Sequence, residues 1–309
     1  MKTNRIRQNF LPLLTALIWG TAFVAQSVGA GYLGPFAFNA ARAIIAFSFL
    51  LALCALLRLA RRGKQAPRPA SYWRDLAAGA LCCGTALSVA SYFQQKGLED
   101  TTAGKAGFIT ALYIVLVPIF GIFLKKKAPK IIWLGVALAV VGLYFLCINE
   151  ELTVTGGGLY VFLCAVCFAV QILAVDHFTQ KVEGVELSCG QFLVMSVLSA
   201  AGMLAWEMPS WEGLRLCLWP VLYVGVFSSG VAYTLQILAQ KDSNPTVVSL
   251  IMSLESVFAT IAGAILLHDR MSGREYLGCG LMLAAVILTQ LPEPKKRAAA
   301  PGGKVEASR

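Results

Sequence analysis

The sequence predicts an all-α integral membrane protein with ten transmembrane helices, arranged as two inverted five-helix repeats. Three observations lead to this prediction: an apolar composition, a regular series of long apolar segments, and a weak internal repeat. Of 309 residues, 58% are hydrophobic and 14% are charged, and the mean hydropathy is +0.70. Water-soluble domains of this length do not carry such a composition. We therefore expect the lipid bilayer to be the main solvent of this chain.

The apolar segments have the length that a bilayer requires. A spanning helix needs roughly 20 mostly apolar residues. We expect such helices at residues 10–29, 36–57, 75–93, 104–124, 131–148, 157–178, 189–206, 216–238, 246–267 and 275–291. The connections between them are short and leave no room for a soluble domain. Lys2, Arg5 and Arg7 imitate the start of a signal peptide, but the following apolar run is too long for one, so we expect it to remain as the first helix.

Positive charge is concentrated in alternate connections. The basic residues of these connections and ends are Lys2, Arg5, Arg7, Arg58, Arg61, Arg62, Lys64, Arg68, Arg74, Lys125, Lys126, Lys127, Lys130, Lys295, Lys296, Arg297, Lys304 and Arg309. By the positive-inside rule this side is the cytoplasm. We expect a multi-pass protein of the cytoplasmic (inner) membrane, with both termini and a basic tail at 295–309 in the cytoplasm. Charge sorted by loop in this way also argues against a nucleic-acid partner.

Enzymatic and metal chemistry find little support in the sequence. The nine cysteines lie in or beside apolar segments, and Cys164 and Cys167 lack further ligands at metal-binding spacing, so we expect no metal or cofactor. The two histidines, His177 and His268, fall on opposite expected faces, which argues against a membrane enzyme acting on lipid-linked substrates. That enzyme remains the less favoured alternative. A receptor or scaffold would need an extramembrane surface that the sequence does not offer.

An internal repeat divides the chain. The segment "ALCCGTALSVASYFQQ" (80–95) matches "VFSSGVAYTLQILAQK" (226–241), and "FITALYIVLVPIFGIFL" (108–124) matches "LIMSLESVFATIAGAIL" (250–266) with Leu112 over Leu254. Both matches run in the same order, which indicates one repeat over 1–150 and a second over 151–294. An odd number of crossings per repeat gives the halves opposite orientations, a plan that places a solute site near the midplane.

The chain resembles a known family over nearly its whole length. The segment "LIWGTAFVAQS" (17–27) and the helix pairs at 107–146 and 249–288 look like EamA-type members of the drug/metabolite transporter superfamily. The resemblance implies a ten-helix, alternating-access carrier with a central cavity, whose relatives mostly export amino acids and related metabolites. Uptake of another small solute is the alternative. Family members usually have Pro after the second-half Leu-Glu, whereas Ser256 follows Glu255 here, so the resemblance does not settle a helix break at this point.

Two charged residues are the first candidates for a solute site. Glu255 lies inside an apolar span, where an unpaired acid costs about 2.5–3.5 kcal/mol. It could carry a proton, hold a solute amine, or fix helix packing through a hydrogen bond. Arg42 could meet a solute carboxylate, or it could extend to the membrane surface as an anchor. Asn39 lies one turn earlier on the same helix face and could assist either role.

Polar and aromatic residues supply the remaining candidates. Trp19, Phe23 and Gln26 share one stripe of the first helix and could form a cavity wall, or could serve helix packing beside Gly20. Further solute-binding candidates, each of which could instead be a packing residue, are Tyr92, Tyr113, Gln171, Tyr233 and Gln236. Pro118 and Gly121 could act as a hinge. Glycine-rich helix faces permit a homodimer without requiring one.

Overall fold

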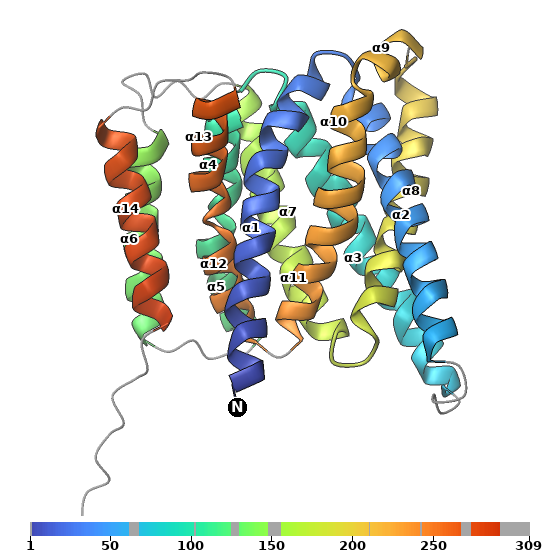
Figure 1. Ribbon diagram of the computed structural model, residues 1–309, viewed down its shortest axis with the longest axis horizontal. Coiled ribbons are helices and arrows are strands. Elements are labelled where there is room, and N and C mark those ends of the chain that lie inside the picture. The colour runs from blue at the N-terminus through green and yellow to red at the C-terminus, as the bar shows by residue number, and fades with distance from the viewer. Residues whose placement is uncertain are drawn as a thin grey trace, which may run out of the picture.

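The computed structural model describes residues 2–61, 68–101, 103–124, 130–147, 156–209, 211–241, 243–266 and 273–290. These residues form helices and the turns between them, without a strand in any of the described ranges. Figure 1 shows the helices packed side by side between two loop-bearing faces. We call the face where α1 begins the N-terminal face, and the other the opposite face. The predicted all-α class is confirmed.

The helices follow one another along the chain with short connections. In order they are α1 (Lys2–Ala30), α2 (Pro35–Ala60), α3 (Ala70–Gly97), α4 (Ala103–Ala111), α5 (Tyr113–Phe123), α6 (Lys130–Cys147), α7 (Gly156–Phe178), α8 (Gly184–Trp206), α9 (Trp211–Leu216), α10 (Leu218–Tyr223), the π-helix η1 (Val224–Ala232), α11 (Tyr233–Gln240), α12 (Pro245–Met252), α13 (Glu255–Leu266) and α14 (Gly273–Gln290). In Figure 1, α6 and α14 pack together at one edge, α2 and α8 at the other, and α1 lies between them.

Eight helical segments of the described residues are long and apolar enough to cross a membrane. They are Asn9–Ala30, Pro35–Ala60, Ala70–Gly97, Ala106–Phe123, Gly156–Phe178, Gly184–Trp206, Leu218–Gln240 and Pro245–Leu266. Helices α6 and α14 contain shorter apolar stretches, Trp133–Gly142 and Tyr276–Ala285. The protein is therefore a multi-pass, all-helical membrane protein, and the expected count of ten crossings in inverted repeats stays a prediction.

Two of the spanning segments are interrupted within the membrane. Helix α4 ends before Leu112 and α5 follows it, while α12 ends before Ser253 and α13 begins at Glu255. The second break occurs without a proline. The hydroxyl groups of Ser253 and Ser256 donate to the carbonyls of Leu250 and Ser253 at 2.7 and 2.8 Å, and such local side-chain bonds compete with helical backbone pairing. Leu112 and Leu254, matched in the sequence repeat, thus both lie at a break.

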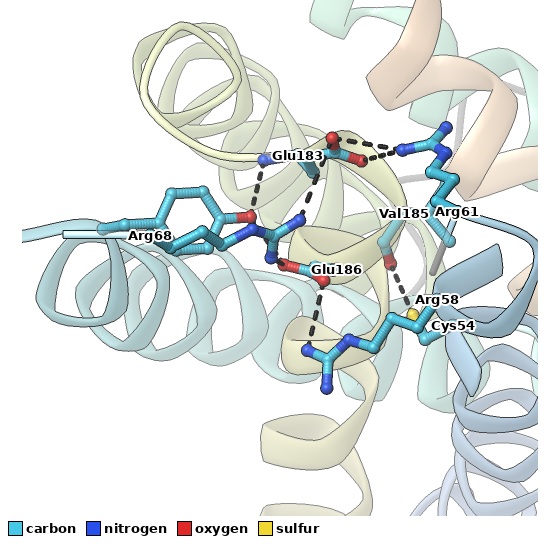
Figure 2. A network of polar contacts seen from close by, with 8 residues as sticks. Cys54, Arg58, Arg61, Arg68, Glu183, Val185 and Glu186 are labelled. Carbon is cyan, nitrogen blue, oxygen red and sulfur yellow. Dashed lines mark hydrogen bonds and ion pairs between the residues drawn. The ribbon is translucent and has the colours of Figure 1, made fainter. Parts of the chain in front are cut away.

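The paired helices α2 and α8 join the two halves of the chain at both faces. At the N-terminal face Glu186 of α8 accepts hydrogen bonds from Arg58 at 3.2 Å and from Arg68, as Figure 2 shows. It also accepts one from the hydroxyl of Tyr72 at 2.5 Å. At the opposite face the carboxylate of Glu207 accepts hydrogen bonds from the first backbone N–H groups of α2, at 2.8 and 2.7 Å. A helix N-terminus favours such an anionic partner. The pair is therefore fastened at each end.

Candidate functional site

A small cavity lies among the central helices. Its free volume is about 20 Å³, comparable to the space that one ordered water fills. The lining residues are Trp19, Phe23, Gln26, Arg42, Gln94, Thr110, Tyr113, Phe168, Gln171, Ile172, Ser228, Tyr233, Gln236 and Glu255. The structure thus brings every solute-binding candidate from the sequence to this cavity except Asn39 and Tyr92. They come from both halves of the chain.

Arg42 contributes a buried guanidinium to the cavity. Its side chain is 2% exposed, and its Nη1 donates a hydrogen bond to Oε1 of Gln26 at 3.1 Å. Within the described ranges, Nε of Arg42 has no hydrogen-bond partner. In the anchoring alternative the guanidinium would reach the membrane surface, whereas here it is buried beside the cavity. The arrangement can bind an anion, because a guanidinium recognises carboxylates through two parallel N–H groups.

Glu255 is the first residue of α13, so its carboxylate lies at the start of a half-helix inside the membrane. The side chain is 2% exposed and interacts electrostatically with Tyr113, the first residue of α5. Their contact lacks direct hydrogen-bond geometry, and no other described residue pairs with the Tyr113 hydroxyl or with Oε1 of Glu255. The free N–H groups of a helix start stabilise negative charge. The two breaks therefore place a phenol and an acid at the cavity.

Helix α1 forms one wall of the cavity and is bonded to η1. The indole N–H of Trp19 donates to the carbonyl of Ser228 at 3.3 Å, and the ring of Trp19 lies 4.7 Å from that of Tyr233. On the other side, a Cβ on Gly20 would lie 2.4 Å from Cβ of Phe258. Gly20 lets α1 and α13 approach closely, while Trp19 lines the cavity; binding of a solute by this wall stays a prediction.

A chain of glutamines extends from the cavity into the second half. Gln236 donates to Gln171 at 3.3 Å, and Gln171 donates to Gln191 at 3.3 Å, so the amides link α11, α7 and α8. All three side chains are fully buried. The sequence reading had not singled out Gln191 for any role. Its polarity within the apolar segment at 189–206 was the available signal.

Other lining residues were also missed from the sequence. They are Gln94, Thr110, Phe168, Ile172 and Ser228. A signal existed for Phe168, because Phe168 and Gln171 repeat the spacing of Phe23 and Gln26. No sequence signal pointed to Ser228, because it acts through its backbone carbonyl within a π-helix. Such helices often occur at functional positions, but side-chain patterns do not reveal them.

Two candidates lie elsewhere. Asn39 is 1% exposed but does not line the cavity, and neither its amide nitrogen nor its oxygen has a partner in the described part of the chain. Tyr92 is half-buried and stacks on Phe36 with ring centroids 4.5 Å apart. Its aromatic ring serves packing between α3 and α2.

The hinge candidates Pro118 and Gly121 are buried inside α5, and the helix is interrupted at Leu112 instead. Whether these two residues bend during function stays a prediction. For metal binding, the described ranges contain no group of three or more His, Cys, Asp or Glu side chains placed to hold an ion. The polar groups at the cavity are suited to an organic solute with hydrogen-bonding and charged groups.

Comparisons with known proteins agree with this architecture. A family model for the EamA-like transporter family matches residues 7–148 and again residues 155–291. A solved crystal structure superposes with a TM-score of 0.73 at 19% identity, covering 92% of this chain and 96% of the other, which supports the fold alone.

Similar sequences occur in archaea and bacteria. An uncharacterized transporter of Archaeoglobus fulgidus is 31% identical over 281 residues, which span 90% of this chain and 84% of that protein. The uncharacterized inner membrane transporter YedA of Escherichia coli K12 is 23% identical over 316 residues, or 96% of this chain and 97% of YedA. The chain, with its many apolar helices around one polar cavity, belongs to the EamA-like transporter family, within the drug/metabolite transporters.

Proposed function

We propose that this membrane transporter exports small zwitterionic metabolites, most simply amino acids or related compounds, through the central cavity. One observation supports the proposal: a basic side chain, Arg42, and an acidic one, Glu255, line the same buried cavity. No ion pair joins them among the described residues. Two opposite charges held apart in a membrane interior are costly unless a bound molecule pairs with each.

A zwitterion supplies both partners. Its carboxylate would bind the Arg42 guanidinium beside Gln26, and its ammonium group would bind Glu255 at the start of α13. Trp19 and Tyr233 provide aromatic surface for the rest of the solute. The free volume of about 20 Å³ is too small for an amino acid, so the cavity must widen to admit one. In this proposal the described conformation is a closed one.

Transport would proceed by alternating access. In this proposal two inverted five-helix repeats, 1–150 and 151–294, rock against each other and open the cavity to one face at a time. The separate family matches to residues 7–148 and 155–291 support two repeats. The breaks at Leu112 and Leu254 support a site at their interface. The positive-inside rule supports cytoplasmic termini, although the tail at 295–309 lies outside the described residues. The rocking would be driven by the solute gradient or by a proton.

Efflux from proteoliposomes tests the proposal. Vesicles containing the purified protein are loaded with a labelled amino-acid mixture, and release is followed with and without a pH gradient. We expect selective release by the wild type, and at least tenfold slower release by Arg42→Gln, because the charge-assisted contact to a carboxylate is lost. Release of cationic amines but not of zwitterions, or equal release by Arg42→Gln, would refute the zwitterion assignment.

The same vesicles separate two roles of Glu255. If Glu255 carries a proton, a pH gradient accelerates release by the wild type but not by Glu255→Gln. If Glu255 holds only the solute ammonium, Glu255→Gln loses release at every pH while anions without an amine are still recognised. Release that ignores both the gradient and the substitution would assign Glu255 a purely structural role.

A further inference from the structure

The two halves of the chain repeat a polar pattern around the cavity. In the first half Phe23 and Gln26 of α1 are accompanied by Asn39 and Arg42 of α2. In the second half the same spacings recur: Phe168 and Gln171 lie on α7, and Ser188 and Gln191 lie on α8. Gln191 therefore occupies the position in its half that Arg42 occupies in the other half.

The two sets are displaced toward different faces of the membrane. Helix α1 ends at Ala30 and α2 begins at Pro35, so Gln26 and Arg42 lie within about two turns of the opposite face. Helix α7 ends and α8 begins at the N-terminal face (Figure 1), so Gln171 and Gln191 lie within about two turns of that face. The cavity lies between the sets.

The glutamines of the second set retain unused hydrogen-bonding capacity. Gln171, Gln191 and Gln236, which we call the inner amide cluster, are joined by two hydrogen bonds of 3.3 Å each. In the part of the chain that the structure covers, Nε2 of Gln191 and Oε1 of Gln236 have no partner, although both side chains are 0% exposed. Buried amides are normally paired. A donor and an acceptor therefore remain free at the N-terminal side of the cavity.

We propose that the inner amide cluster, whose Gln171 and Gln236 line the cavity, is a second solute-binding subsite on the N-terminal side of the cavity. This inference rests on the proposed function. Nε2 of Gln191 would donate to the solute carboxylate, and Oε1 of Gln236 would accept from its ammonium group. An uncharged subsite suits a passage, because binding there must be strong enough for entry and weak enough for release. The solute then moves from the inner amide cluster to Arg42, where a charge replaces the amide.

A purely structural role predicts something different. If the amides only fasten α7, α8 and α11, their removal lowers stability without changing solute recognition. Ser188 offers a matched control, because its hydroxyl bonds that of Thr234 at 2.9 Å and also links α8 to α11. Ser188 lies one turn from Gln191 on the same helix. Neither side chain lines the cavity itself, but Gln191 bonds Gln171, which does, whereas the partner of Ser188 is Thr234.

The test measures the half-saturating solute concentration from each face separately. Right-side-out and inside-out membrane vesicles carrying the wild type, Gln191→Leu or Ser188→Ala take up labelled amino acid in exchange for unlabelled. We expect Gln191→Leu to raise the half-saturating concentration about fivefold to tenfold at the N-terminal face, the effect of one lost hydrogen bond, and less than twofold at the opposite face. Ser188→Ala should leave both values unchanged.

The failures are distinguishable. Unchanged values for Gln191→Leu at both faces, or the same change for Ser188→Ala, would overturn the second subsite and leave the proposed function standing. If the wild type exchanges none of the amino acids, the proposed function fails, and the subsite falls with it. Should Gln191→Leu fail to fold, Gln191→Asn replaces it, because it keeps the amide and shortens its reach; a side-specific increase is again the expected result, and an unchanged value refutes the subsite.

Discussion

Arg58 of α2 contacts Glu186 of α8 with a nitrogen–oxygen distance of 3.2 Å, so a side chain from the first half of the protein pairs with one from the second. Glu186 is 9% exposed, whereas neighbouring Glu183, which pairs with Arg61 at 3.1 Å, is 42% exposed. Figure 2 shows both acids among the arginines at the N-terminal face. The two acids share partners but differ in access to water.

This difference predicts unequal effects on stability. Glu186→Gln should lower the free energy of unfolding by about 1–3 kcal/mol, because a buried, charge-assisted hydrogen-bond acceptor is lost. Glu183→Gln should change it by less than about 1 kcal/mol, since exposed ion pairs contribute little. Thermal unfolding of the purified variants in detergent measures both. Equal destabilisation by the two substitutions would show that burial of Glu186 does not matter.

Gly20 makes a second prediction. A Cβ at this position would lie 2.7 Å from the carbonyl oxygen of Glu255 and 2.8 Å from the backbone nitrogen of Ala259, atoms that cannot move aside. Gly20→Ala should therefore separate α1 from α13, displace Glu255, and lower both thermal stability and transport. In the control, Gly280→Ala, a Cβ meets open space. That control should be neutral or slightly stabilising, because alanine favours helix. A stable, active Gly20→Ala protein would contradict the close packing.

The cavity wall of α1 makes a third prediction. Gln26→Leu removes the acceptor for Nη1 of Arg42, so the guanidinium loses its orientation and transport should fall at least tenfold while the protein still folds. Trp19→Leu should act similarly through loss of aromatic surface. Tyr92→Phe is the matched control, because Tyr92 lies outside the cavity lining. Initial rates of efflux, normalised to the amount of reconstituted protein, measure these effects. A wild-type rate for Gln26→Leu would show that Gln26 is not part of the solute site.

Topology supplies a fourth prediction. The connection after α2 is basic, so a cysteine placed at Gly63, in a segment outside the described residues, should face the cytoplasm. It should stay unlabelled when intact cells meet an impermeant thiol reagent, and react once the cells are opened. Labelling in intact cells would show that the connection faces the outside, the opposite of the predicted orientation. A cysteine at exposed Met208, near the other end of α8, is the complementary control and should be labelled from outside.

The helix class and the candidate set were accessible from the sequence for a definite reason. Burying an apolar segment in lipid depends on the composition of that segment alone, so single-helix hydropathy identifies the spanning segments. Placing an acid such as Glu255 in an apolar span likewise costs free energy of insertion, whichever residues surround it. That cost is visible without knowing any neighbour. The resemblance to EamA-type proteins could also be found without the tertiary structure, because it rests on contiguous sequence motifs.

The tertiary structure decided which polar residues meet. Asn39 and Arg42 share a helix face in the sequence, yet Arg42 lines the cavity and Asn39 does not. The break before Glu255 occurs without a proline, and the hydroxyls of Ser253 and Ser256 bond backbone carbonyls there. Gln191 gains its place from partners on α7 and α11. Composition fixes the solvent of each helix, but the faces that meet depend on close packing between segments far apart in the chain.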